Sequence, residues 1–279
     1  VLANPLARDI TIKLTWPDPE GKQVTRSVAV PAGSTVRQTL EAQAPAARAG
    51  IYAMDLRFET EGLPWAGTLR YSAPVMRWVG QLPPDHRNPD WVLNTSEDVV
   101  SFTGADPALA ALNWQGPEDL SARIWLWQHE DALRIRVDVR DDIHVQKETA
   151  VNLWRADSIQ LAFQLPGEKA YWEIGAAQTD TGETLRVAWI TPPGFKDAEK
   201  LFDVTCAGMD GGLRYEFTLP CARFGLTKQS LERGLRFNLI VNDNDGKLRE
   251  QFIRIAPGIG ESKDPSAFPV IHFQAQTPP

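Results

Sequence analysis

The sequence predicts an all-β protein of two modules, a small immunoglobulin-like sandwich followed by a larger antiparallel β-sandwich or jelly roll. Apolar and polar residues alternate with a period of two along most of the 279 residues, and long helical periodicity is nearly absent. A polar, proline-rich segment separates two runs of such strands. We therefore assign residues 1–82 to the first module, 83–90 to a linker and 91–279 to the second module.

Short strands separated by turn residues are expected in the first module. They are Ile10–Trp16, Gln23–Val30, Gly50–Glu59 and Thr68–Ser72. Strands of this length, punctuated by glycine and proline, are typical of an immunoglobulin-like module of about 80 residues.

The second module is expected to contain a hairpin, a three-stranded meander and further antiparallel strands. The hairpin strands are Arg123–Gln128 and Ala132–Arg140. The meander and later strands are Asp157–Leu165, Tyr171–Gln178, Glu183–Ile190, Arg214–Leu219, Leu235–Asp243 and Lys247–Ile255.

The composition argues against several classes of partner. A net charge of −7, with acidic and basic residues interspersed, disfavours nucleic acid and anionic membrane surfaces. The longest apolar runs are far shorter than the roughly 20 residues that span a bilayer. Ten tryptophans are the unusual feature, because indole faces pack against the C–H groups of sugar rings as well as filling cores.

The two cysteines are expected to be free thiols. Cys206 faces Tyr215 across a predicted hairpin, and Cys221 lies on the second strand of that hairpin, about six positions beyond Tyr215. At about 3.3 Å per residue the two sulfur atoms are separated by about 20 Å, which is beyond the reach of a disulfide.

Strand register places three residues in a row across one face of the predicted meander. Gln160 is expected opposite Gly175, and Gly175 opposite Arg186, while aliphatic side chains point to the other face. An amide and a guanidinium beside a glycine form a floor with polar walls, which suits a hydroxyl-rich ligand. A solvated outer face that contains a glycine fits the same pattern.

Other candidate residues flank this row. Trp154 precedes the first meander strand, where an indole can stack on a sugar ring. Asn238 and Asn242 alternate with apolar residues along a later strand and are expected to complete the floor. Trp125 and Trp127 lie beside two arginines, either as a structural ladder of indole and guanidinium groups, which we favour, or as a second platform.

From about Trp114 onward, the chain resembles the family 9 carbohydrate-binding modules and their relatives in bacterial polysaccharide-degrading proteins. The segments that carry the resemblance follow one another in the family's order. They are Val137–Asp142, Leu153–Gln160, Tyr215–Pro220, Phe237–Asp243 and Lys263–Phe268.

The resemblance implies a module that binds carbohydrate and does not cut it. In the family a sugar ring lies between two aromatic side chains, with polar groups on its hydroxyls. Trp154 matches the first aromatic, Gln160 falls where the family often has Glu, and Arg186 matches the family's Arg. A secreted or periplasmic location is implied too, in a polysaccharide-degrading protein that also supplies a catalytic domain as partner.

This sequence departs from the family pattern at three positions. The second aromatic of sugar-binding members corresponds here to Ser262, while Ile240 replaces a Gln and Cys221 replaces a Trp. A lost stacking face costs about 1–3 kcal/mol by analogy with other ring contacts. A structural spacer that has lost its sugar site is therefore the alternative function. A third is partner binding through the face around Trp125 and Arg134, which predicts oligomers.

Asp141 and Asp142 are the candidate metal ligands, because they end a strand at the edge of the predicted site and relatives carry structural Ca²⁺. Calcium is the one cofactor expected. The segment from Asp243 to Gly246 begins like a calcium loop, but Arg254 stands at its twelfth position, so a hairpin turn explains it better.

No catalytic constellation is expected. The four histidines are scattered, and neither a phosphate-binding loop nor a nucleophile elbow occurs. The sequence establishes no pair of carboxylates of the kind a glycosidase needs. A b-type haem, as in related electron-transfer sandwiches, is disfavoured because Met209 is the sole methionine of the second module.

Overall fold

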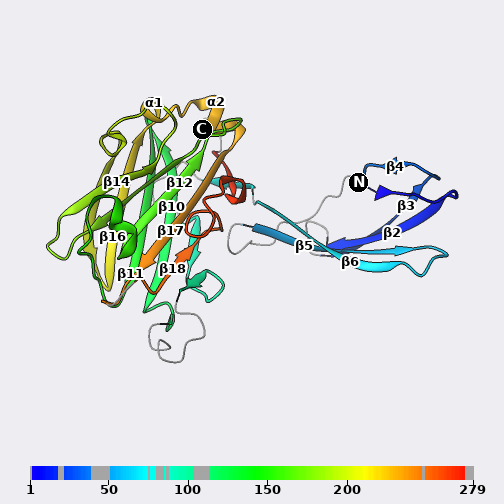
Figure 1. Cartoon of the computed structure of the whole chain (residues 1–279), viewed down its shortest axis with the longest axis horizontal. Coiled ribbons are helices and arrows are strands. Elements are labelled where there is room, and N and C mark those ends of the chain that lie inside the picture. The colour runs from blue at the N-terminus through cyan, green and yellow to red at the C-terminus, as the bar shows by residue number, and fades with distance from the viewer. Residues whose placement is uncertain are drawn as a thin grey trace. The chain divides into compact units, whose positions relative to one another are not determined.

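The computed structural model describes residues 2–17, 22–38, 51–74, 76–79, 85, 88–102, 113–246 and 249–273, with side chains for all of these except 51–54, 69–74, 76–79 and 232. The chain divides between residues 75 and 76 into two units, both built almost entirely of antiparallel strands (Figure 1), which confirms the all-β fold class. None of the described helices has the length and apolarity needed to cross a bilayer.

The first unit contains a four-stranded antiparallel sheet. Its strands, in spatial order, are β3 (Gln23–Val30), β2 (Ile10–Pro17), β5 (Ile51–Thr60) and β6 (Ala66–Pro74), and a separate pair joins β1 (Leu2–Ala3) to β4 (Thr35–Val36). Alternate residues of β2 and β3 form its core, because successive side chains of a strand point to opposite faces. The four predicted strands are confirmed, and the immunoglobulin-like sandwich stays a prediction.

The second unit is built from two sheets that enclose one core. The five-stranded sheet has the order β15 (Asp203–Met209), β16 (Gly212–Pro220), β11 (Ala132–Asp141), β10 (Leu120–His129) and β8 (Trp91–Leu93). The larger sheet has the order β14 (Thr184–Ile190), β13 (Trp172–Gln178), β12 (Ser158–Gln164), β17 (Leu235–Asp243), β18 (Gln251–Arg254) and β9 (Val99–Ser101). β19 (Val270–Phe273) joins it beside β17 and pairs in turn with β7 (Met76–Val79).

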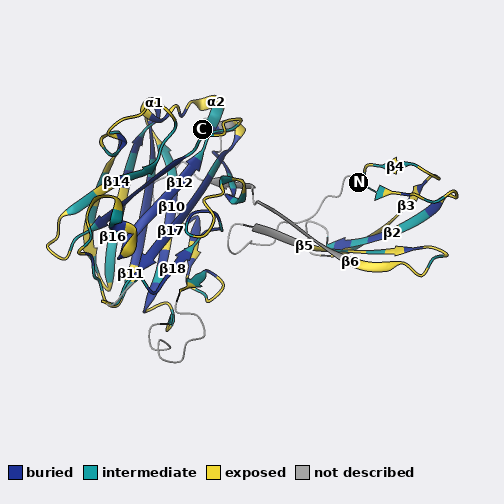
Figure 2. Cartoon of the chain, viewed as in Figure 1, coloured by how far each residue is buried: buried dark blue, intermediate teal, exposed yellow. Residues whose placement is uncertain are grey.

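The core lies between the inner faces of these two sheets, where Figure 2 shows strands that are almost wholly buried. Ile135 and Val137 of β11 face Leu161 of β12 and Leu239 of β17 in one apolar cluster, and all four are fully buried. Burial of each such side chain stabilises the fold by about 1.5–3 kcal/mol. The outer faces of the two sheets are therefore the surfaces left for function.

Two features place the start of the second unit before the predicted linker. β7, which the sequence assigned to the first module, pairs in parallel with β19 at Val270–Phe273. Asp85, in the predicted linker, forms an ion pair with Arg136 of β11, with 3.1 Å between its Oδ1 and the arginine Nη1. Residues 80–84, 86 and 87 lie outside the described part of the chain.

The meander has the predicted strands, but half of its predicted register is wrong. Gln160 pairs with Gly175 as expected, whereas Gly175 pairs with Val187, and Arg186 pairs with Ala176. The connecting loop spans 179–183 and places Gly182 at a φ of 85°, which adds one residue to the expected turn. Because a slip of one residue reverses the facing of a strand, Arg186 points away from Gln160.

The two cysteines behave as expected. Cys206 pairs with Tyr215 across β15 and β16, and Cys221 begins helix α1 (Cys221–Phe224). Both are free thiols.

Candidate functional site

A cavity of about 360 Å³ lies on the outer face of the larger sheet, and we call it the tryptophan cavity. Its volume is at the lower end of the range of about 300–1,000 Å³ that is usual for ligand pockets. Strands β12, β13 and β14 supply its floor, and the segments before β12 and on either side of β18 supply its walls. Its lining residues are Trp154, Gln160, Glu173, Trp189, Ile190, Arg249, Gly260 and Lys263.

Trp154 is presented at this cavity by the short 3-10 helix η4 (Ala150–Arg155). The preceding residue, Leu153, is fully buried and packs with Ala177 and Val187 on the outer face of the sheet. This contact anchors η4, while Trp154 itself stays 37% exposed. An exposed indole on an anchored segment can stack on a sugar ring with little loss of conformational freedom.

Trp189 is a second indole in the cavity, and the sequence reasoning missed it. Leu185, Val187 and Trp189 alternate along β14 on its outer face, so the same one-residue slip that turns Arg186 away brings Trp189 outward. The Trp189 ring lies over Gly175, where a Cβ atom would come within 2.5 Å of ring atom Cζ3. Its Nε1 donates a hydrogen bond of 2.8 Å to the carbonyl of Val151 in η4, so the ring is held in place.

Polar groups on the floor of the cavity come from β12 and β13. Gln160 is 3% exposed and Glu173 is 1% exposed, and both line the cavity. Lys263 Nζ lies 2.5 Å from Glu173 Oε1, whereas Glu173 Oε2 is buried without a hydrogen-bond partner. Burial raises the pKa of Glu173, although Lys263 opposes this shift. The floor therefore holds an amide, a carboxylate oxygen and an ammonium group that a ligand can contact.

Arg249 forms part of the wall, and its guanidinium lies among aromatic rings. The guanidinium carbon is 4.7 Å from the ring centroid of Phe102, 4.8 Å from Phe252 and 5.6 Å from Trp154. Its Nε and Nη2 are buried without hydrogen-bond partners. Burial lowers the pKa of Arg249 to about 10, which leaves the side chain charged at neutral pH.

Three of the five predicted ligand-binding residues lie outside this cavity. Arg186 ties the two sheets together at their edge, because its Nη1 donates to the carbonyl of Phe202 at 2.6 Å and to Asp203 Oδ1 at 3.0 Å. Asn238 is fully buried, and its Nδ2 donates to two backbone carbonyls of the segment that follows β18. Asn242 donates to Ser158 Oγ at 2.8 Å, at the far end of the strand. Trp154 and Gln160 are the predicted residues that the structure brings together.

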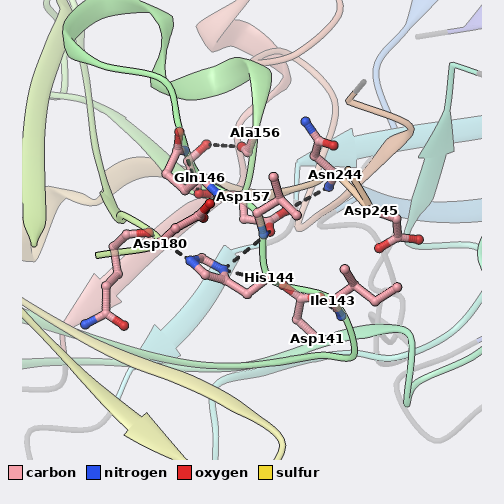
Figure 3. A network of polar contacts seen from close by, with 12 residues as sticks. Asp141, Ile143, His144, Gln146, Ala156, Asp157, Asp180, Asn244 and Asp245 are labelled. Atoms are coloured by element: carbon pink, nitrogen blue, oxygen red, sulfur yellow. Dashed lines mark hydrogen bonds and ion pairs between the residues drawn. The ribbon is translucent and has the colours of Figure 1, made fainter. Parts of the chain in front are cut away.

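A second polar region, which contains the predicted metal ligands, surrounds the ends of β11 and β17. Figure 3 shows His144 between two carboxylates, with its Nδ1 3.3 Å from Asp157 Oδ2 and 3.8 Å from Asp141 Oδ2. His144 Nε2 donates to the carbonyl of Gln178 at 2.8 Å. Burial lowers the pKa of His144, but the hydrogen bonds to Asp141 and Asp157 outweigh it and raise the pKa to about 10. This part of the network is an internal ion pair.

More carboxylates than these gather at the same end. Ligand atoms within 4.8 Å of one another are offered by Asp119, Asp243 and Asp245, and also by Asp141, Asp142 and Asp245. Gln251 Nε2 donates to Asp243 Oδ2 at 2.6 Å, but Asp243 Oδ1 and Asp245 Oδ1 are buried without hydrogen-bond partners. Burial, opposed by Gln251 and reinforced by neighbouring carboxylates, raises the pKa of Asp243 to about 9. We call this group of five residues the aspartate cluster.

The outer face of the five-stranded sheet carries the ladder that the sequence predicted. The Arg136 guanidinium carbon lies 5.9 Å from the Trp125 ring, and Trp125 is only 7% exposed. Arg134 donates from Nη1 to Thr218 Oγ1 at 2.5 Å, in the register position opposite Trp127. The structural interpretation of the ladder is confirmed for the pair of Trp125 and Arg136.

Comparison with protein families decides the identity of the second unit. A family model described as carbohydrate family 9 binding domain-like matches residues 101–275, which is more than half of the chain. The chain belongs to this family. A comparison with curated proteins returns no match. Family membership makes carbohydrate binding without catalysis the function of this region.

Several solved structures match the chain at low sequence identity. A family 9 carbohydrate-binding module from Caldicellulosiruptor kristjanssonii, solved in complex with glucose, has 14% identity and a TM-score of 0.47, covering 72% of this chain and 97% of its own. The same module with cellotriose gives the same identity and TM-score and covers 72% of this chain and 95% of its own. A carbohydrate-binding protein from Bacteroides uniformis has 11% identity and a TM-score of 0.45, with coverage of 72% and 99%.

The three departures from the family 9 pattern have different places in the structure. Ser262 is exposed and is absent from the lining of the tryptophan cavity, where Trp189 supplies a second indole instead. Ile240 is fully buried in a small apolar cluster with Phe252 and Phe268. Cys221 packs against the main core. The last two substitutions are therefore matters of packing, and only the first concerns the cavity.

Proposed function

We propose that the tryptophan cavity is the carbohydrate-binding site of this family 9 domain. Trp154 and Trp189 supply indole faces for a sugar ring, and Gln160, Glu173 and Lys263 supply the groups that hydrogen-bond to its hydroxyls. The single observation that carries this proposal is the presence of two indoles and a buried, partly unpaired carboxylate in one cavity. Ligand pockets combine apolar walls with a few convergent polar groups in this way.

Binding at this cavity is passive. Glu173 is the one carboxylate among the lining residues, and Lys263 already pairs with it. A glycosidase needs two carboxyl groups that flank the scissile bond. The cavity therefore supports retention of a sugar rather than its hydrolysis.

We also propose that the aspartate cluster holds a structural calcium ion. Calcium prefers carboxylate and carbonyl oxygens, which is the donor set that Asp119, Asp141, Asp142, Asp243 and Asp245 supply. The buried oxygens of Asp243 and Asp245 that lack hydrogen-bond partners fit such an ion. In this role a bound cation neutralises carboxylates that otherwise repel one another.

The proposed calcium site lies on the same loop as the cavity wall. Asp243 ends β17 and Asp245 follows it, both ahead of Arg249, and Asp245 N donates to Glu250 Oε2 at 3.0 Å. A cation at the aspartate cluster would therefore hold the start of this segment, and the hydrogen bond between Asp245 and Glu250 ties that start to the end that carries Arg249. Residues 247 and 248 lie outside the described part of the chain.

A location outside the cytoplasm, in a protein that degrades polysaccharides and carries its own catalytic domain, remains our proposal for the biological context. It is supported by the family assignment alone. Fractionation of cells that express the full-length protein tests the location, and recovery in the cytoplasmic fraction contradicts it.

The experiment that tests the carbohydrate site is a glycan-array screen with and without Ca²⁺, followed by calorimetry on each ligand found. We expect Trp154→Ala and Trp189→Ala each to weaken binding by about 1–3 kcal/mol. Trp65→Ala is the matched control, because Trp65 is an exposed tryptophan of the first unit, 47% exposed, and its loss should leave affinity unchanged.

The alternative function, a structural spacer without a sugar site, predicts a different result. If the folded protein binds no glycan in either condition, the spacer is correct and the proposed site is wrong. If glycans bind but neither tryptophan substitution weakens their binding, carbohydrate binding remains the function and the site lies elsewhere.

A further inference from the structure

Arg249 is a charge in the tryptophan cavity that has no partner of opposite sign among the described residues. No carboxylate lies within ion-pair distance of it in that part of the chain, and Nε and Nη2 are buried without hydrogen bonds. The rings of Phe102, Phe252 and Trp154 surround the guanidinium and hold it in the cavity wall. A buried cation without a counterion carries a desolvation cost that these ring contacts offset only in part, so a negatively charged ligand would complete the site.

Among the residues that line the cavity, Arg249 and Lys263 are cations and Glu173 is the one carboxylate, so the lining carries a net positive charge. Lys263 is occupied by Glu173, at 2.5 Å, and this pair contributes no net charge. The guanidinium carbon of Arg155 lies 5.4 Å from the ring centroid of Trp154, which adds a second cation near that indole. The chain as a whole carries −7, so a local excess of positive charge is a property of this site and not of the composition.

We infer that the tryptophan cavity selects an acidic sugar, a uronic acid whose carboxylate pairs with Arg249. This inference rests on the proposed carbohydrate site and adds the substrate class. A guanidinium presents planar, paired N–H groups that match a carboxylate, and such charge-assisted hydrogen bonds are about twice as strong as neutral ones. A neutral sugar hydroxyl would satisfy one N–H group and leave the charge uncompensated.

The first measurement needs only the wild-type protein. Calorimetry compares an oligogalacturonate with its fully methyl-esterified form, which keeps the sugar and removes the charge. We expect the free acid to bind at least about tenfold more tightly, since a close charge pair in a desolvated site is worth at least that factor. We also expect this advantage to shrink between about 0.05 and about 0.5 M NaCl, as screening increases. An oligoglucuronate tests whether the preference extends to a second uronic acid.

Variants then locate the charge that recognises the ligand. Arg249→Gln keeps hydrogen-bond donors and loses the charge, so it should reduce affinity for the free acid at least about tenfold and affinity for the ester much less. Arg249→Lys keeps the charge but loses the planar pair of N–H groups. Its affinity for the free acid should therefore lie between that of the wild type and that of Arg249→Gln. Arg123→Gln removes one positive charge from the outer face of the other sheet and should change neither affinity. Thermal melting of each variant verifies that it is folded.

The outcomes separate this inference from the proposed function. Equal binding of acid and ester, or tighter binding of neutral glucans, overturns the acidic-sugar inference and leaves the carbohydrate site intact. Preference for sulfated over carboxylated sugars shows an anion site but contradicts the uronic acid. Absence of binding to every sugar, acidic or neutral, removes the proposed function itself. If Arg249→Gln leaves affinity for the free acid unchanged, Arg249 does not recognise the carboxylate.

Discussion

The two outer faces of the second unit differ in whether their charged side chains are paired with opposite charges. On the five-stranded sheet, Asp138 accepts from Arg214 Nε at 2.7 Å and from Nη2 at 2.9 Å, and Arg136 Nε lies 3.2 Å from Glu216 Oε1. On the larger sheet, Arg249 has no ion-pair partner among the described residues, and one oxygen of Glu173 accepts no hydrogen bond. Both faces carry arginine beside tryptophan, so composition alone does not distinguish them.

The difference separates structural charges from those available to a ligand. Charges that are paired with one another rigidify a sheet and offer little to a ligand, and this holds on the five-stranded sheet although Arg134 Nε and Arg136 Nε make no hydrogen bond. A buried charge without a counterion is costly, and a ligand of opposite charge can offset that cost. This contrast argues against partner binding at the ladder around Trp125, which is 7% exposed, and in favour of binding at the tryptophan cavity.

The largest expected effect comes from removing a carboxylate from the network of paired charges on the five-stranded sheet. Asp138→Ala removes a carboxylate that is 4% exposed and that faces three arginines, Arg214 at 2.7 Å, Arg136 at 3.7 Å and Arg123 at 3.9 Å. We expect the free energy of unfolding to fall by about 3 kcal/mol, because the arginines lose their shared partner. Denaturant titration measures this change, and sugar affinity should be unaffected.

Its counterpart on the other face is Arg249→Leu. Since Arg249 has no counterion to lose, we expect its removal to leave the free energy of unfolding unchanged or to raise it by up to about 1 kcal/mol. A loss as large as that of Asp138→Ala would mean that Arg249 is a structural charge too, and the contrast between the two faces would not hold.

Calcium removal should produce the next largest effect. With Ca²⁺ at about 100 times its Kd, linkage predicts about 2.7 kcal/mol of added stability, which a chelator should remove. The measurement is thermal melting with excess Ca²⁺ and with chelator. Unchanged melting under both conditions would show that the aspartate cluster holds no calcium.

The pH dependence of the calcium-free protein sharpens that test. Burial, above all, raises the pKa of Asp243 to about 9, of Asp157 to about 7 and of Asp245 to about 6. A carboxyl whose pKa is raised by folding binds more protons in the folded than in the unfolded chain, so it destabilises the fold as pH rises through that range. His144, with its pKa raised to about 10, acts in the same direction above its ordinary pKa. The melting temperature without calcium should therefore fall from about pH 5 to about pH 8, and the increment from calcium should grow.

Most of the fold could be predicted from the sequence, because its information is local. The alternation along β11 can be predicted from four consecutive residues. Ile135 and Val137 point inward, and Arg136 and Asp138 point outward. The pairing of Gln160 with Gly175 followed from the length of one turn. In the next turn a single residue more, with Gly182 in the left-handed region, was enough to send Arg186 to the other face.

The candidate site was predicted only in part, because it depends on contacts that no short segment determines. Trp154 and Gln160 were found through their strand and its neighbour. Trp189 was missed because the predicted register of β14 was off by one residue, which put Leu185, Val187 and Trp189 on the wrong face. Arg249 and Lys263 come from loops whose path is fixed by packing against Phe252 and Glu173. A signal for Trp189 did exist, since a glycine in a central strand often marks a close approach, and Gly175 has an indole over it.

A substitution at Gly175 tests that close approach directly. Gly175→Ala would place a Cβ atom 2.2 Å from the carbonyl oxygen of Ile159 and 2.5 Å from Trp189 Cζ3, so the strand and the indole must both shift. We expect a loss of about 1–3 kcal/mol in the free energy of unfolding, together with weaker sugar binding because Trp189 leaves its place. Gly208→Ala is the matched control, since Gly208 is also in a strand and a Cβ there meets nothing within 4 Å. If Gly175→Ala destabilised the fold but left sugar affinity intact, Trp189 would be a packing residue, and Trp154 would be the indole on which binding depends.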